Sequence, residues 1–364
     1  MAAEVDLLVL AELNPDVLVS SGDADMRFGQ VEQLIDRASI TLGSSGAITA
    51  CAAAAQGLRV AVCAVIGDDP IGEWTAEQLR GHGVDIAGVI RRPGRQTGMS
   101  VVLTRSDGDR AILTYSGTMP DLTAADVTPG RLRSARHVHV SSFFLQRGLQ
   151  AGLAGLLGAA RQAGATTSLD TGWAPAGEWA SAGPALRHVH YLLPNAAECA
   201  HLAAALDAAA LDAAALDAAA LDAAALDGTA LDGTGGHAQR GEEHDHGDGE
   251  SQPTALRAAA LRRLGPDVAV KLGASGALAV TRGGVTRVRG RAVAPVDTTG
   301  AGDCFNAGFI AGVLDGSTTA DSLRRAVACG SIAVTGWGGT GRLATRAEAL
   351  QAAAQLPSEQ LPSG

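Results

Sequence analysis

A glycine-rich stretch late in the chain combines residue types that could bind an anion and accept a proton. Residues 296–309 read Val-Asp-Thr-Thr-Gly-Ala-Gly-Asp-Cys-Phe-Asn-Ala-Gly-Phe, and the apolar residues that follow recur at helical spacing. The run at residues 291–294 predicts the end of a strand, which places the glycines at a strand-to-helix turn. Gly300 and Gly302 permit close backbone approaches, and the first N–H groups of a helix have no partner within it. We therefore predict an anion site here.

Asp303 lies in the mouth of this turn, where its negative charge would repel a bound phosphate. A carboxylate is useful in that place if it takes a proton from a group that attacks the phosphate. A loop of glycines followed by an Asp that favours the positive end of a helix dipole would explain the same residues without any chemistry. The length of the motif favours the first interpretation.

The whole string D-T-T-G-A-G-D-x-F-x-A-G-F closely resembles the second signature of the ribokinase-like, or PfkB, carbohydrate kinase family. The resemblance implies that Gly300, Ala301 and Gly302 form the anion hole for the transferring phosphoryl group. It also implies that Asp303 is the catalytic base.

Two metal ions are implied by the same resemblance. Asn195 and Glu198 form an N-x-x-E pattern that is a common helix start but matches the family motif tied to magnesium and phosphate organisation. These two residues would act through metal-bound waters, because Mg²⁺ dehydrates reluctantly. In many family members a monovalent cation, often potassium, lies beside the anion hole, and Asp297 and Thr299 match positions that help to hold it.

Polar residues follow the first predicted strand, an apolar run at residues 5–10. Asn14 and Asp16 flank a proline at its carboxyl end, where ligands of α/β folds gather. Turn formation is the commoner role of Asn-Pro-Asp. Because the family uses an Asp at this place to bind substrate hydroxyls, we expect sugar contact for Asp16, and both roles stay open for Asn14.

The segment 42–50 opens an Ala-rich helix and resembles the first family signature, a Gly-Gly pair followed by Asn. Gly43 retains the second glycine, and we expect it to bind the substrate. Leu42 replaces the first glycine and Ala47 replaces the Asn. Since the family positions form a hinge and a substrate contact, sugar binding should differ in detail while the phosphoryl chemistry does not.

The nucleotide side is indicated by two further glycine turns. A strand at residues 267–271 runs into a turn with Gly273 and Gly276, which resembles the family segment that borders the nucleotide. Lys271 could neutralise phosphate or simply reach solvent. Gly338 belongs to a glycine turn at residues 336–341 that resembles the adenosine-side loop.

The fold class is predicted from the alternation of strands and helices over residues 138–194, which is typical of a mainly parallel sheet. With the resemblance, this implies a three-layer α/β ribokinase-like fold, with helices flanking the central sheet and a small β-sheet lid. Lid strands are expected at roughly 12–40 and 95–118, with a hairpin turn at 106–109. Closure of such a lid keeps water from the phosphoryl group, and family members often bury its exposed face by forming a homodimer.

Four histidines occur at every second position in two predicted strands, which suggests either a metal site or structural residues. Because these histidines have no acidic or Cys partners in the pattern, the structural interpretation is favoured. The residues are His137, His139, His188 and His190. The five cysteines lack C-x-x-C spacing and are expected to be small buried hydrophobic residues.

Composition divides the 364 residues into a kinase domain, 1–202 and 253–357, an insertion at 203–252, and a tail at 358–364. The insertion repeats A-A-A-L-D and then becomes polar, as expected for a disordered segment or an isolated helix. It carries eleven acidic residues and one Arg, which accounts for the net charge of −10 and leaves no basic stripe for nucleic acid. No apolar run approaches a membrane span, so we expect a soluble, cytoplasmic protein.

The sequence thus predicts an ATP- and Mg²⁺-dependent phosphotransferase acting on a hydroxyl of a sugar or sugar derivative. A nucleoside or vitamin-type kinase on the same fold is the alternative, as is a carbohydrate sensor that has lost turnover. A dinucleotide-dependent oxidoreductase is disfavoured because no G-x-G-x-x-G follows the first strand. Whether the substrate already carries a phosphate stays open, since Arg92, Arg105 and Arg110 could bind one or simply decorate the lid.

Overall fold

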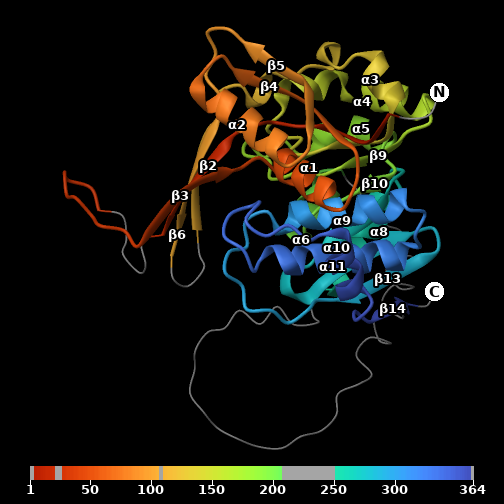
Figure 1. The fold of residues 1–364 in the computed structure, drawn as a ribbon. Helices are drawn as coiled ribbons and strands as arrows, with labels where there is room; N and C mark the ends of the chain where they lie inside the picture. The colour runs from red at the N-terminus through yellow and green to blue at the C-terminus, as the bar shows by residue number, and fades with distance from the viewer. Residues whose placement is uncertain (1–3, 21–26, 106–109, 207–250, 362–364) are drawn as a thin grey trace, which may run out of the picture.

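The computed structural model describes residues 4–20, 27–105, 110–206 and 251–361. They form a large sheet with helices on both faces, and a small separate sheet (Figure 1). Among these residues the large sheet has ten strands in the order β14-β13-β12-β11-β10-β9-β8-β1-β4-β5. The pairs from β11 to β5 are parallel, and β12, β13 and β14 are added antiparallel at one end. The strands are β1 Val5–Leu10, β4 Val60–Gly67, β5 Asp85–Arg92, β8 Ala135–Val140, β9 Thr166–Leu169, β10 Tyr191–Leu192, β11 Asp267–Lys271, β12 Gly276–Thr281, β13 Gly284–Arg289 and β14 Ser358–Leu361.

The apolar run of β1 shows why the sheet lies in the middle. Successive side chains of a strand point to opposite faces. Leu7 and Val9 belong to one hydrophobic cluster, and Leu8 and Leu10 belong to a second one. A strand buried on both faces is typical of parallel sheets covered by helices.

Helices cover both faces of the large sheet and complete the three layers. One face carries α1 Ser45–Ala55, α2 Pro70–Gly81, α9 Ala301–Leu314, α10 Thr319–Ala333 and α11 Arg346–Ala353. The other carries α3 Pro129–Ser134, α4 Arg147–Gln162, α5 Gly183–Leu186, α6 Ala196–Ala205 and α8 Ser251–Arg262. Short 3₁₀ turns lie at η1 Met119–Asp121, η2 Ala124–Asp126, η3 Trp179–Ala182 and η5 Gly273–Ser275. No helix of the described segments is long and apolar enough to cross a membrane.

The small sheet projects from the body of the molecule (Figure 1) and has the order β3-β2-β6-β7. Its strands are β2 Pro15–Ser20, β3 Arg37–Leu42, β6 Met99–Thr104 and β7 Arg110–Tyr115. The register places Asp16 beside Ser100, and Ser100 beside Thr114, so one face carries polar side chains near the body. On the opposite face lie Ile40 and Leu113, which are 63% and 57% exposed. The predicted fold, a mainly parallel sheet with a small β-sheet, is confirmed.

Two local predictions were wrong. Residues 291–294 are not a strand: β13 ends at Arg289, and the chain leaves the sheet before Pro295, which has no N–H to donate to a sheet ladder. The glycine motif is therefore entered from a loop. The supposed tail contributes β14, because Ser358 and the residues after it pair with β13. The repetitive part of the predicted insertion and the turn at 106–109 lie outside the described residues.

The histidines of β8 have hydroxyl partners inside the sheet. The ring nitrogens of His137 lie 2.7 Å from Thr166 Oγ1 and 2.7 Å from Ser168 Oγ. Nδ1 of His139 lies 2.7 Å from the same Ser168 hydroxyl. These contacts support the structural interpretation of His137 and His139. His188 and His190 precede β10, so the prediction that they lie within a strand was wrong. The five cysteines are buried and free, as predicted.

Candidate active site

The predicted anion turn is built at the N-terminus of α9, where Gly300 is the capping residue with φ 75°. This left-handed conformation favours glycine. An added Cβ at Gly300 would also lie 2.8 Å from Cα of Gly339, so the neighbouring glycine loop leaves no room for a side chain. Ala301, Gly302 and Asp303 form the first turn of α9. Their N–H groups lie at the positive end of the helix dipole, as an anion hole requires.

Asp303 is held from the side of α1. The Ser45 hydroxyl donates a hydrogen bond to Oδ1 of Asp303, and Thr49 Oγ1 donates to the Asp303 backbone carbonyl at 3.3 Å. Burial and the charge of Asp170 raise the pKa of the Asp303 carboxyl to about 8. A group whose pKa lies near the working pH is suited to accept and release a proton.

Lys271 approaches the same turn from the end of β11. Its Nζ lies 2.7 Å from Asp170 Oδ2, and Asn306 of α9 donates to the same oxygen at 2.5 Å. The Lys271 side chain is 14% exposed, so the solvent-facing alternative is excluded. A Cβ added to Gly302 would lie 3.5 Å from Lys271 Nζ, which places the ammonium group against the anion turn. Burial lowers the pKa of Lys271, but the charges of Asp170 and Glu198 outweigh it and hold that pKa above its usual value.

Asp170 was missed as a functional residue by sequence reasoning. It follows β9 at the carboxyl end of the sheet and is 4% exposed. Burial alone would raise the pKa of Asp170, but the charge and hydrogen bond of Lys271 hold it below its usual value. Its position directly after a predicted parallel strand was the available signal.

Asn195 and Glu198 form a capping box at the start of α6. The Asn195 N–H donates to Glu198 Oε2 at 2.9 Å, and the Glu198 N–H donates to Asn195 Oδ1 at 2.9 Å. The helix-start interpretation of N-x-x-E is therefore confirmed, and the magnesium role stays a prediction. Asn195 forms a bridge with Lys271, so the box lies beside the anion turn. Burial and the charge of Asp170 raise the pKa of Glu198 to about 7.

The oxygen donors near this box fit Mg²⁺, which prefers carboxylates and waters. Glu198 and Asp170 both lie close enough to Lys271 to affect its pKa. Within the described segments, no three acidic, His or Cys side chains gather into a metal cage.

The predicted substrate residues come together at the base of the small sheet. Asn14 Nδ2 donates to Asp16 Oδ1 at 3.0 Å and lies 3.5 Å from Ser100 Oγ. A Cβ added to Gly43 would lie 2.2 Å from Asp16 Oδ1, so only glycine permits this approach. Leu42 and Ala47, the two departures from the family pattern, are buried in the hydrophobic core and bring no polar group to this region.

Glu12 is a second buried carboxyl that sequence reasoning missed. It follows β1 and is 2% exposed. Its Oε1 accepts from the Ser45 N–H at 3.0 Å, and the Ser141 hydroxyl lies 3.4 Å from its Oε2. Burial raises the pKa of Glu12 to about 7. An isolated acid at the end of an apolar strand was the signal that could have found it.

The residues expected at the potassium site tie two loops together. Asp297 Oδ1 accepts from the Thr299 N–H at 2.9 Å and from the Thr299 hydroxyl at 2.7 Å. Asp297 Oδ2 accepts from the Gly338 N–H at 2.8 Å. The structure therefore joins the anion motif to the 336–341 loop, while cation binding stays a prediction.

The glycines expected near the nucleotide have conformations that favour glycine. Gly273 begins the 3₁₀ turn between β11 and β12, and Gly276 caps its end, with φ 57° and 97°. Gly338 has φ 76°, and a Cβ there would lie 2.8 Å from Cγ2 of Thr41 in β3. These contacts explain the glycines, and nucleotide binding stays a prediction.

A family model described as pfkB family carbohydrate kinase matches residues 12–224 and 241–346. The chain belongs to this family. The match confirms the predicted family and enzyme class. It spans the candidate site residues from Asn14 to Gly338.

The chain is similar to kinases that are named for different substrates. A 2-dehydro-3-deoxygluconokinase of Bacillus subtilis is 27% identical, covering 82% of each chain. An ATP-dependent ribose-1-phosphate kinase of Halopiger xanaduensis is 29% identical, covering 80% of this chain and 79% of the relative. The fold is similar to that of an Arabidopsis thaliana ribokinase solved with ribose and ATP, with a TM-score of 0.71, 22% identity and coverage of 97% and 99%.

Proposed function

We propose that this carbohydrate kinase transfers the γ-phosphoryl group of Mg-ATP to a hydroxyl of a sugar or sugar derivative, with Asp303 as the base. The observation that carries the proposal is the position of Asp303. The Ser45 hydroxyl, near the proposed acceptor residues, donates a hydrogen bond to the Asp303 carboxylate. Burial raises the pKa of Asp303, while the charge of Lys271, near the proposed phosphate site, lowers it. The carboxylate therefore contacts the start of α1, two residues after Gly43, which approaches Asp16 closely.

The proposed step needs one proton transfer and one displacement. The acceptor hydroxyl gives its proton to the Asp303 carboxylate while its oxygen forms a bond to the γ-phosphorus. The bond from that phosphorus to the bridging oxygen breaks, and ADP leaves with the electron pair. N–H groups of Gly300, Ala301 and Gly302 donate to the phosphoryl oxygens as charge develops.

Residues on the nucleotide side bind and orient ATP. Lys271 offers a fixed positive charge to the phosphates, and Gly273, Gly276 and Gly338 allow the backbone to approach the nucleotide. Mg²⁺, when bound, neutralises phosphate charge. Asn195 and Glu198 would hold its waters, and Asp297 and Thr299 would hold a monovalent cation beside the turn.

The small sheet acts as a lid over the acceptor. Its polar face presents Asp16 to the substrate, and Asn14 and Gly43 do so from the ends of β2 and β3. Closure keeps water from the phosphoryl group. The opposite face, with exposed Ile40 and Leu113, is an apolar surface that a second copy of the chain would cover. A cytoplasmic location stays a prediction.

The proposed activity is tested by measuring ADP release from Mg-ATP across a panel of sugars, sugar phosphates, sugar acids and nucleosides. We expect one class of acceptor to drive ADP release and to become phosphorylated in equal amount. Stimulation by nucleosides alone would favour the nucleoside kinase. No turnover with any acceptor, together with a sugar-induced rise in melting temperature, would contradict the kinase and favour the sensor.

A further inference from the structure

A cavity of about 360 Å³ lies at the amino-terminal ends of β10 and β11, opposite the end of the sheet that carries the candidate active site. The position is fixed by β11, because its first residue, Asp267, lines the cavity, while its last residue, Lys271, faces the anion turn. The cavity is at the small end of the range for small-molecule sites. Substrates of open α/β sheets bind at the carboxyl ends of the strands. This cavity therefore belongs to a different site.

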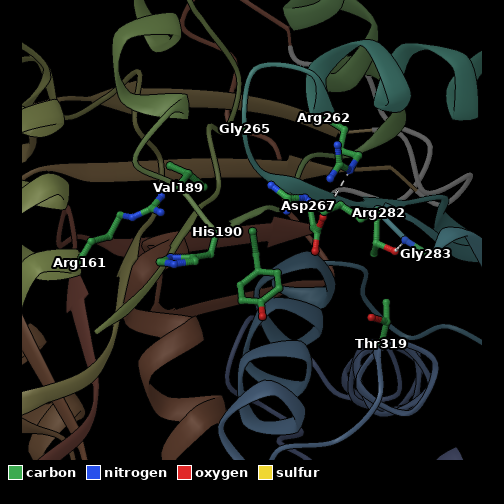
Figure 2. Close-up of a pocket in the computed structure, with 11 residues that line it drawn as sticks. Arg161, Val189, His190, Arg262, Gly265, Asp267, Arg282, Gly283 and Thr319 are labelled. Atoms are coloured by element: carbon green, nitrogen blue, oxygen red, sulfur yellow. Dashed lines mark hydrogen bonds and ion pairs between the residues drawn. The ribbon is translucent and has the colours of Figure 1, made fainter. Parts of the chain in front are cut away.

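Three guanidinium groups from separate elements surround the cavity. Arg161 lies near the end of α4, Arg262 ends α8, and Arg282 lies in the turn between β12 and β13 (Figure 2). Asp267 is the one acidic residue among the lining residues. The lining therefore has an excess of positive charge, and like charges held around one hollow repel each other unless an anion enters.

The existing contacts leave much of this charge unneutralised. Nε of Arg262 lies 3.6 Å from Asp267 Oδ1, which is too long for a hydrogen bond. The same nitrogen is buried and has no hydrogen-bond partner among the described residues. Arg161 donates only to the carbonyl of Arg187, at 3.2 Å, among the contacts of the described chain. A bound oxyanion would add hydrogen-bond acceptors for the guanidinium groups that line the cavity.

The rest of the lining offers further contacts to a phosphorylated molecule. Thr319, the first residue of α10, brings a hydroxyl and the positive end of a helix dipole. His190 and Tyr191 line the floor, with ring centroids 6.3 Å apart. Aromatic and heterocyclic rings of this kind can pack against the organic part of a small ligand.

We propose that this cavity binds a phosphate-bearing small molecule. Guanidinium forks match the oxygens of a phosphate, and several forks around one hollow suit a group with about two negative charges better than a carboxylate with one. The phosphate lies among Arg161, Arg262 and Arg282, and the organic part packs against Tyr191. This inference does not depend on the proposed phosphoryl transfer, because the proposed catalytic residues lie at the carboxyl ends of the strands.

Isothermal titration with inorganic phosphate tests the proposal, and the comparison of a cavity variant with a control variant separates this site from the catalytic one. The test variant is Arg161→Gln/Arg282→Gln, since both side chains lie on the surface and their loss should not prevent folding. Arg80→Gln/Arg133→Gln, two exposed arginines elsewhere, is the charge-matched control. We expect the test variant to lose affinity by about tenfold or more, while the control keeps wild-type affinity.

The proposal would be overturned if the test and control variants bound phosphate with equal affinity, whether that affinity matched the wild type or was reduced in both. Equally weak heats with phosphate, sulfate and chloride would also overturn it, because they would indicate general screening of surface charge. Melting temperatures of the variants provide the second measurement. Phosphate should raise the melting temperature of the wild type and of the control but not that of the test variant.

Discussion

The Ser45 hydroxyl donates a hydrogen bond to Oδ1 of Asp303, although the two residues lie 258 positions apart in the chain. Ser45 begins α1, and Asp303 lies in the first turn of α9. The N–H of Ser45 donates to Glu12, so the end of β1 also belongs to this arrangement. The contact joins the segment that should bind the acceptor to the residue that should take its proton.

Ser45→Ala should shift the pH dependence of the reaction. The Ser45 hydrogen bond favours the charged carboxylate and lowers the pKa of Asp303, which burial raises to about 8. Its removal should move the acid limb of kcat/KM upward by about one pH unit, since one pKa unit corresponds to about 1.4 kcal/mol. Thr49→Val, which removes a contact to the Asp303 backbone only, is the matched control. An unchanged profile in Ser45→Ala would contradict this role.

Glu12→Gln should flatten the pH dependence of stability. Burial raises the pKa of Glu12 from 4.5 to about 7 in the folded state, so the folded protein holds this proton more tightly than the unfolded chain. The resulting stability is fully present below the unfolded pKa and is lost as pH rises through about 7. The wild type should therefore lose free energy of unfolding between pH 4.5 and about 7, at about 1.4 kcal/mol per unit of pKa difference.

Urea unfolding at several pH values measures this effect. Glu12→Gln should show a smaller decrease in the free energy of unfolding than the wild type does. Glu77→Gln, on the exposed side of α2, should keep the wild-type slope. A parallel decrease in all three proteins would show that Glu12 is not responsible.

Gly308→Ala should destabilise the packing of α9 against α10. The added Cβ would lie 2.8 Å from Cys329 Sγ and 2.9 Å from Cα of Ala326, and backbone cannot move aside cheaply. Overpacking of this kind costs about 2 kcal/mol in the free energy of unfolding. Gly155→Ala in α4 is the control, because its Cβ would meet nothing within 4 Å. That substitution should stabilise the protein by about 0.5 kcal/mol, and the reverse order of the two variants would refute the packing argument.

The parts of the site that were predictable from sequence are those in which a local pattern fixes both conformation and chemistry. The glycine turn before Asp303 is of this kind, since its backbone and its helix follow from adjacent residues. Asp170 and Glu12 could not be assigned in this way, because their importance comes from burial beside partners far along the chain. Lys271 left two alternatives open until its contact with Asp170 was known.

The fold was predictable to a similar degree. The buried run of β1 and the alternating strands and helices indicated a mainly parallel sheet, which the structure confirms. Residues 291–294, before the glycine motif, were misassigned as a strand because an apolar run resembles a strand even where no neighbouring strand pairs with it. β14 was missed because a short polar segment becomes a strand only through its neighbour β13.

The central claim, that Asp303 is the base of a phosphoryl transfer, is tested most directly by Asp303→Asn. With the best acceptor from the panel, kcat should fall by about 10²- to 10⁴-fold, the usual contribution of a general base. Binding of Mg-ATP and the melting temperature should stay near those of the wild type. Asp68→Asn, an exposed Asp outside the candidate site, should keep full activity. Turnover by Asp303→Asn within a fewfold of the wild type would contradict the claim.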